Sequence, residues 1–144
     1  MDTLQRLAIE AECSRLMTTF SLCTDTFDYD RALGLFVPDC TFQRADEVFE
    51  GLDGLRFVLN RRNPERITRH IVSNMLIDVK DETTATGQAY ALVFGHVGAL
   101  DENGEAPLGA PDSLVIFNGG FTRTDEGWRI KTWRIDLSFR RKAA

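Results

Sequence analysis

The chain has 144 residues, of which 43% are hydrophobic and 27% are charged, and this balance fits one globular domain over residues 1–144. Its net charge of −5 argues against nucleic acid or an anionic membrane as the main partner. No apolar run approaches the roughly 20 residues of a membrane span, and the first residues lack the apolar core of a signal peptide.

The first half of the sequence predicts helices. A stripe at spacings of three and four residues predicts a long amphipathic helix, formed by Ile9, Cys13, Leu16, Phe20, Cys23 and Phe27. Asp28 or Asp30 is a candidate cap for a short second helix carrying Leu33 and Phe36. Residues 40–43 predict a short strand. A third helix is predicted from Gly51 to about residue 63, before Pro64.

The cysteines give no metal-ligand spacing. They are three in number, and two of them, Cys13 and Cys23, lie on the apolar stripe of the first helix. An odd number of cysteines of this kind favours buried, reduced thiols and a cytoplasmic protein.

After residue 66 the pattern changes to that of strands. Residues 67–79, 84–97, 113–124 and 127–139 are rich in Val, Ile, Phe, Thr and Trp and are separated by turn residues. The segment 99–112 holds two glycines and two prolines and predicts a long loop, which we expect at a pocket mouth or at a subunit contact. Helices followed by antiparallel strands indicate an α+β fold, in which a strongly curved sheet wraps around three helices and leaves a conical pocket.

The only two histidines both lie in predicted strands. Alternation places His70 on one face with Val72 and Asn74, and His96 on one face with Leu92 and Phe94. Histidine is the usual proton carrier near neutral pH, and a buried imidazole needs a polar partner. Asp25, at the end of the first helix, is a candidate partner. A structural role for each of the three residues is the alternative that spacing alone leaves open.

Four segments resemble the SnoaL-like branch of the nuclear transport factor 2-like superfamily. They are residues 24–31 (TDTFDYDR), 35–39 (LFVPD), 68–74 (TRHIVSN) and 127–130 (GWRI). The pattern is most similar to scytalone dehydratase, hexachlorocyclohexane dehydrochlorinase and bile-acid dehydratases. The resemblance implies a cone-shaped α+β barrel of cystatin-like topology, no cofactor, no metal, and association as a homo-oligomer, a dimer or a trimer.

The resemblance also implies a site. In the dehydratase-like group an aspartate near the end of the first helix pairs with a histidine on the following long strand, and Asp25 and His70 match these positions. His96 matches a second histidine of scytalone dehydratase. The tyrosines that orient substrate in that enzyme have no match, since position 24 is Thr24 and position 44 is Arg44. Residues 115–117 (VIF) replace a strand segment that is polar in scytalone dehydratase.

Three functions are compatible with this sequence. The first is a cofactor-independent lyase or isomerase in which Asp25, His70 and His96 act as acid–base groups on a hydrophobic, cyclic, polyketide- or steroid-like molecule. The expected substrate-binding residues are then Phe20, Phe42, Asn74, Phe94, Phe117 and Trp133. The second is a non-catalytic binding protein, or a module like the small subunit of ring-hydroxylating dioxygenases. The third is an iron site formed by the two histidines and Asp25, although their spacing is unusual for it.

None of these three functions accounts for a cluster of arginines. Its members are Arg56, Arg61, Arg62, Arg66 and Arg69. A solvated surface laced with salt bridges is one interpretation, and a guide for an anionic substrate or carrier is the other.

Overall fold

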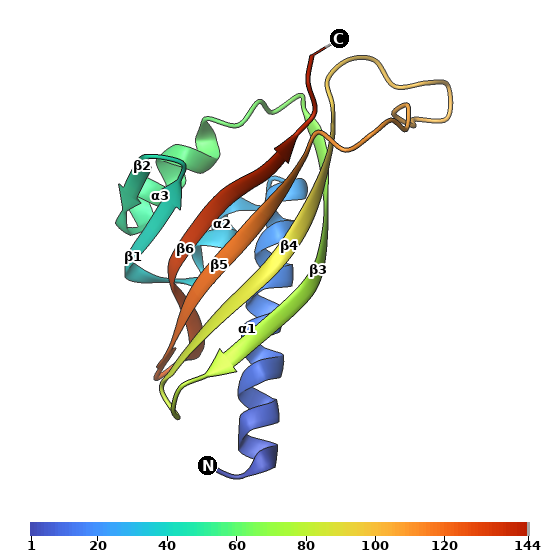
Figure 1. Cartoon of the computed structure of the whole chain (residues 1–144). Helices are drawn as coiled ribbons and strands as arrows, with labels where there is room; N and C mark the ends of the chain where they lie inside the picture. Colours follow the sequence, from blue (N-terminus) through green and yellow to red (C-terminus); the bar gives the residue numbers. More distant parts are fainter. Residues whose placement is uncertain (144) are drawn as a thin grey trace.

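The computed structural model describes residues 1–143 and places three helices against one side of a curved sheet (Figure 1). In chain order the elements are α1 (Thr3–Asp25), α2 (Tyr29–Leu33), β1 (Phe36–Arg44), β2 (Glu47–Glu50), α3 (Gly51–Asn60), β3 (Ile67–Val79), β4 (Thr84–His96), β5 (Ser113–Thr124) and β6 (Gly127–Arg140). The strand order is β2-β1-β6-β5-β4-β3. Neighbouring strands are antiparallel except β1 and β6, which are parallel. The predicted α+β class is therefore confirmed.

The sheet curves around the helices, as expected for a cone-shaped fold, but it stays open and does not close into a barrel. Strands β2 and β3 form its two edges and are not paired with each other. The strand β2 is too short to extend the sheet around the helices, and α3 covers this end by packing on β1 and β2. The result is a curved sheet with one concave, helix-covered face.

Helix α1 is the main support of that face. Its N-terminus carries a capping box, in which the Asp2 side chain accepts from the backbone of Gln5 and the Gln5 side chain accepts from the backbone of Asp2. The predicted stripe is buried from Ile9 to Cys23 and packs mainly on β3. Phe27 lies beyond the helix with a φ of 58° and is only half-buried. Within residues 1–143, no helix has both the length and the apolar character needed to cross a membrane.

The segment after α1 differs from the prediction in its details. Asp28 caps α2 by accepting from the backbone N–H of Arg31, but the helix ends at Leu33 and Phe36 begins β1. β1 is nine residues long and begins at Phe36, four residues before the short strand predicted at residues 40–43. The strand β2 was not predicted, because four mostly exposed residues give no clear alternation of burial.

The four long strands match their predicted ranges closely, with one interruption. The register between β3 and β4 shifts between Ser73 and Leu76, and Asn74 in this bulge has a φ of 51°. The bulge breaks the alternation, so Asn74 is exposed and does not share the inward face with His70.

The long connection between β4 and β5 projects beyond the end of the sheet, beside the C-terminal end of β6 (Figure 1). Asp112 fixes its return to the sheet, because its backbone N–H donates to Val93 at 2.7 Å and its carbonyl accepts from Arg141 at 2.8 Å. The prediction of a long loop here is confirmed.

We predict that Gly87 is required for the packing of α1 on the sheet. A Cβ at this position would lie 2.6 Å from Ile77 Cδ1 and 3.0 Å from Phe121 Cε2, with Met17 Sδ of α1 at 3.2 Å. Gly87→Val should therefore lower the free energy of unfolding by about 1–3 kcal/mol, measured by urea denaturation. Gly109→Val in the long loop, where a Cβ meets only Arg141 at 3.6 Å, is the control. Equal stability of the two variants would contradict this packing argument.

Candidate active site

A cavity of about 780 Å³ lies between the helices and the concave face of the sheet, within the size range of small-molecule sites. Its walls are apolar and come from six elements, through Phe20, Phe42, Val58, Leu59, Val93, Val115, Phe117 and Ile135. His70 and Thr68 are polar groups on its inner surface, and exposed side chains that include Arg44 and Arg140 form its rim. A smaller hollow of about 310 Å³ near Lys131 has no histidine or cysteine in its lining.

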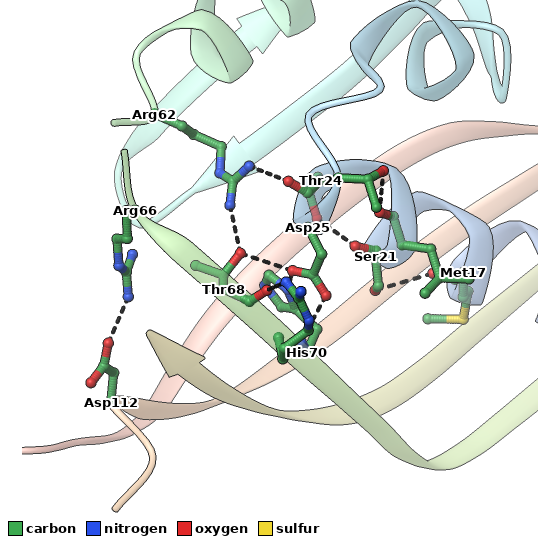
Figure 2. Close-up of polar contacts among 12 residues, drawn as sticks. Met17, Ser21, Thr24, Asp25, Arg62, Arg66, Thr68, His70 and Asp112 are labelled. Atoms are coloured by element: carbon green, nitrogen blue, oxygen red, sulfur yellow. Dashed lines mark hydrogen bonds and ion pairs between the residues drawn. The ribbon is translucent and has the colours of Figure 1, made fainter. Parts of the chain in front are cut away.

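Asp25 and His70 make the expected contact beside this cavity (Figure 2). His70 Nδ1 lies 2.5 Å from Asp25 Oδ1, and the side chains are 14% and 5% exposed, respectively. The same carboxylate accepts from the backbone N–H of His70 at 2.9 Å and from the Thr68 hydroxyl at 2.8 Å. Three donors thus compensate the burial of one carboxylate.

The edge position of β3 explains why an aspartate fits here. An edge strand has one row of backbone N–H groups without a strand partner, and α1 packs along β3. Asp25 is the last residue of α1, so its side chain reaches the N–H of His70 and the ring of the same residue. The carboxylate therefore caps the strand edge and orients the imidazole at once.

This contact decides the tautomer of His70. A carboxylate oxygen only accepts hydrogen bonds, so Nδ1 carries the proton and Nε2 of the neutral ring keeps a lone pair. The His70 ring lines the cavity and lies 6.2 Å from the Phe117 ring between centroids. The neutral ring can therefore accept a proton on Nε2.

Asp25 remains ionised in spite of its burial. Burial by itself raises the pKa of this carboxyl, but hydrogen bonds from the side chain and backbone of His70 and from Thr68 outweigh it, and the pKa is lowered overall. The negative charge stabilises an imidazolium on His70 when the ring takes up a proton.

Two residues that sequence reasoning missed support the pair. Thr68 is fully buried, and its hydroxyl accepts from Arg62 Nη2 at 3.0 Å while donating to Asp25. Arg62 also donates to the carbonyl of Thr24 and to the hydroxyl of Tyr29. Thr68 could have been found from alternation, since it lies two residues before His70. The role of Arg62 had no signal beyond its place in the arginine cluster.

His96 does not reach the site, so the expected convergence of three residues is wrong. His70 pairs with Val93 on the concave face, and the odd separation from Val93 puts His96 on the outer face. His96 Nε2 lies 3.2 Å from the carbonyl of Ala99. Asp25, His70 and His96 therefore do not form the iron triad considered above. Phe94 shares the outer face and does not line the cavity, against our expectation.

Of the remaining residues expected to bind substrate, some line the cavity and others do not. Phe20, Phe42 and Phe117 line the cavity, whereas Asn74 is excluded by its bulge. Trp133 lies behind the wall, packed at 5.2 Å from Phe20 and 5.0 Å from Phe117 between ring centroids. Among the buried side-chain nitrogen and oxygen atoms of residues 1–143, only Trp133 Nε1 has no hydrogen-bond partner. Trp133 supports the wall but is not part of the cavity surface.

The arginine cluster and the long loop both contribute to the rim. Arg56 pairs with Asp30 and Arg61 pairs with Glu47, as a salt-bridged surface would. Arg61, Arg62 and Arg66 also line the cavity. Asp112, the last residue of the loop, lines it as well and pairs with Arg66 at 2.7 Å. Residues 99–111 do not line the cavity, so only the end of the loop lies at its mouth.

We predict that the ionised carboxylate of Asp25 makes the free energy of unfolding depend on pH in the acid range. Because its folded pKa is lowered, the carboxylate contributes its full stabilisation above the unfolded pKa of about 3.9 and loses it as the pH falls through the folded value. At pH 7 the free energy of unfolding of the wild type should be about 1–3 kcal/mol higher than that of Asp25→Asn. This difference should shrink below pH ~4. Urea denaturation from pH 3 to 7 measures it.

Asp81→Asn is the control for this measurement. Asp81 lies at the β3–β4 turn, where hydrogen bonds from Thr83 and Thr84 lower its pKa to about 2. This variant should keep the part of the acid dependence that comes from Asp25. A difference between wild type and Asp25→Asn that stays constant from pH 3 to 7 would contradict the role of the Asp25 charge.

A family model described as a SnoaL-like domain matches residues 5–134. No curated protein matches the chain.

Several solved structures share the fold. A candidate scytalone dehydratase from Novosphingobium aromaticivorans is 20% identical, with a TM-score of 0.79 over 96% of this chain and 89% of that one. The hexachlorocyclohexane dehydrochlorinase LinA-type3 from Novosphingobium barchaimii is 17% identical, with a TM-score of 0.79 over 99% of this chain and 95% of that one. A protein of unknown function with a cystatin-like fold from Nostoc punctiforme is 18% identical, with a TM-score of 0.74 over 96% of this chain and 94% of that one. At these identities the similarity establishes the fold alone. With the family model covering most of its length, the chain belongs to the SnoaL-like domain family.

Proposed function

We propose that this protein is a cofactor-independent lyase or isomerase of the dehydratase type. The observation that carries the proposal is the contact of Asp25 with His70 Nδ1 beside a large apolar cavity. The dehydratase and dehydrochlorinase among the structural neighbours support the same class of reaction. The cavity size and its aromatic lining favour a hydrophobic, cyclic substrate, such as a polyketide- or steroid-like molecule.

His70 acts as the base in this proposal. Nε2 removes a proton from a carbon next to a carbonyl group, and Asp25 stabilises the imidazolium that results. The electron pair of the broken C–H bond forms a C=C bond, and the C–O bond to a leaving hydroxyl breaks. The same imidazolium returns its proton to the departing oxygen, which leaves as water. Return of the proton to a different carbon of the substrate gives isomerisation.

The absence of His96 from the cavity changes the mechanism expected from the sequence. A second histidine for proton return is not required, because His70 itself holds the proton after abstraction. One base that removes and returns the proton acts from one side of the substrate. Departure of the proton and the hydroxyl from the same face is therefore the expected stereochemistry.

We predict that Asp25→Asn and His70→Gln each lower kcat/KM by about 10²–10⁴-fold. The assay is a panel of cyclic β-hydroxy ketones, in which elimination produces a conjugated ketone that absorbs in the ultraviolet. His70→Gln removes the proposed base, and without the Asp25 carboxylate the tautomer and the imidazolium lose their support.

His96→Gln is the matched control, because it removes a strand histidine on the outer face and should retain activity. Circular dichroism checks that each variant is folded. Full activity of His70→Gln, or loss of wild-type activity with a chelator, would rule out the proposed chemistry. Specific binding of the ketones without any turnover would instead favour the non-catalytic alternative.

We also propose a homo-oligomer, a dimer or a trimer. The outer face of the sheet carries a continuous apolar row across four strands, made by Ile71, Leu92, Leu114 and Phe139. Ile71 is 53% and Phe139 70% exposed in the single chain, and burial of such a row favours association. A cytoplasmic location fits the three buried, unpaired cysteines.

We predict that sedimentation velocity at micromolar concentration detects a dimer or trimer of the wild type. Ile71→Glu should shift the distribution toward monomer, because a charge in the apolar row would be buried on association. Leu4→Glu, in the exposed first turn of α1, is the control and should leave the distribution unchanged. A wild type that sediments only as monomer refutes this proposal.

A further inference from the structure

The charge of the cavity lining is opposite to that of the whole chain. The chain carries a net charge of −5, yet the lining includes five arginines and two aspartates. We call the five arginines the arginine rim; they are Arg44, Arg61, Arg62, Arg66 and Arg140. Arg62 and Arg66 are half-buried, so the desolvation cost of their charges has to be offset by partners within the protein.

Three arginines of the rim are already neutralised or held by the protein. Arg61 pairs with Glu47 at 3.2 Å, and Arg66 pairs with Asp112 at 2.7 Å. Arg62 is held by its hydrogen bonds to Tyr29 and Thr68. These three stabilise the connection between α3 and β3 and leave little capacity for a ligand charge.

The two aspartates in the lining are occupied as well. Asp112 is shared between Arg66 and Arg141, the latter at 2.6 Å. Asp136 accepts from Arg134 at 3.1 Å and from Asn118 at 3.0 Å. Neither carboxylate has a contact with Arg44 or Arg140.

Arg44 and Arg140 are therefore the two arginines of the rim that no other side chain of residues 1–143 holds. Within residues 1–143 neither side chain forms an ion pair. Arg62 also has no ion pair, but its hydrogen bonds to Tyr29 and Thr68 fix it in place. Arg44 and Arg140 are both exposed, at the C-terminal ends of β1 and β6, and both line the cavity that His70 faces. A guanidinium binds carboxylate and phosphate oxygens through paired hydrogen bonds.

We infer that the ligand of this cavity carries an anionic oxygen group, a carboxylate or a phosphate, which the free guanidinium groups of Arg44 and Arg140 attract to the rim while its apolar body fills the cavity. This inference rests on the proposed function for the identity of the ligand as substrate. It names the substrate class as an apolar cyclic compound whose charged end stays near solvent and whose reacting carbon lies at His70. The cationic rim also attracts such an anion to an otherwise acidic protein.

The test is binding of three compounds with the same ring system, measured by titration calorimetry in low-salt buffer at pH 7.5. The compounds are 2-naphthoate, 2-naphthyl phosphate and the neutral 2-naphthamide. We expect at least one anion to bind roughly tenfold or more tightly than the amide. The ratio of the two affinities should fall as salt is added, because salt screens the charges. The preferred anion tells whether the group is a carboxylate or a phosphate.

Substitutions of the two arginines test whether they cause the preference for the anion over the amide. Arg44→Gln and Arg140→Gln should each weaken binding of the anion, and the double variant should bind acid and amide equally. Arg123→Gln is the matched control, because Arg123 is also an exposed strand arginine without an ion pair but does not line the cavity. Equal binding of anions and amide by the wild type, or a preference that survives in the double variant, overturns the inference.

Binding and turnover separate this inference from the proposed function. His70→Gln should keep the anion preference, since the rim does not depend on the base. Turnover of neutral ketones that depends on His70, without any anion preference, would leave the proposed function in place and overturn the rim as a binding site. An anion preference with full turnover in His70→Gln would support the rim and contradict the proposed chemistry.

Discussion

The carboxylate of Asp25 joins the two halves of the molecule. It ends α1 and accepts from both the backbone and the ring of His70 on the edge strand β3. Since the side chain is 5% exposed, its charge is tolerated only because three donors surround it. The position of α1 along β3, the orientation of the imidazole and the ionisation of the carboxyl thus depend on one set of hydrogen bonds.

The cavity beside this pair has two regions of different chemistry. The aromatic wall and His70 form an apolar region, which suits the proton abstraction proposed for His70. The arginine rim provides charge at the solvent side, built from strand ends and from the connection between α3 and β3. A substrate that uses both regions has an apolar body and one charged end. The tyrosines of scytalone dehydratase are not matched, and Arg44 stands at one of those places, which fits a different substrate in a similar cavity.

The long strands and α1 were predictable because their residues obey a simple periodicity over many positions. The errors fall where that periodicity is interrupted. The bulge at Asn74 turns its side chain out of the inward row, and the four residues of β2 are too few to show alternation. Phe36 has the spacing of a helical residue after Leu33, but the pairing of β1 with β6 fixes it in a strand.

The sequence by itself determined the α+β class, the order of the long elements and the two partners Asp25 and His70, because local periodicity and a short family motif suffice for these. Only the tertiary structure decided that His96 and Phe94 face outward, that the sheet stays open, and that Thr68 and Arg62 support the carboxylate. The register of β3 against β4 and the packing of α1 at the sheet edge set these features. They are contacts between residues far apart in the chain. Local alternation puts Thr68 on the face of His70 but does not identify its partners Asp25 and Arg62.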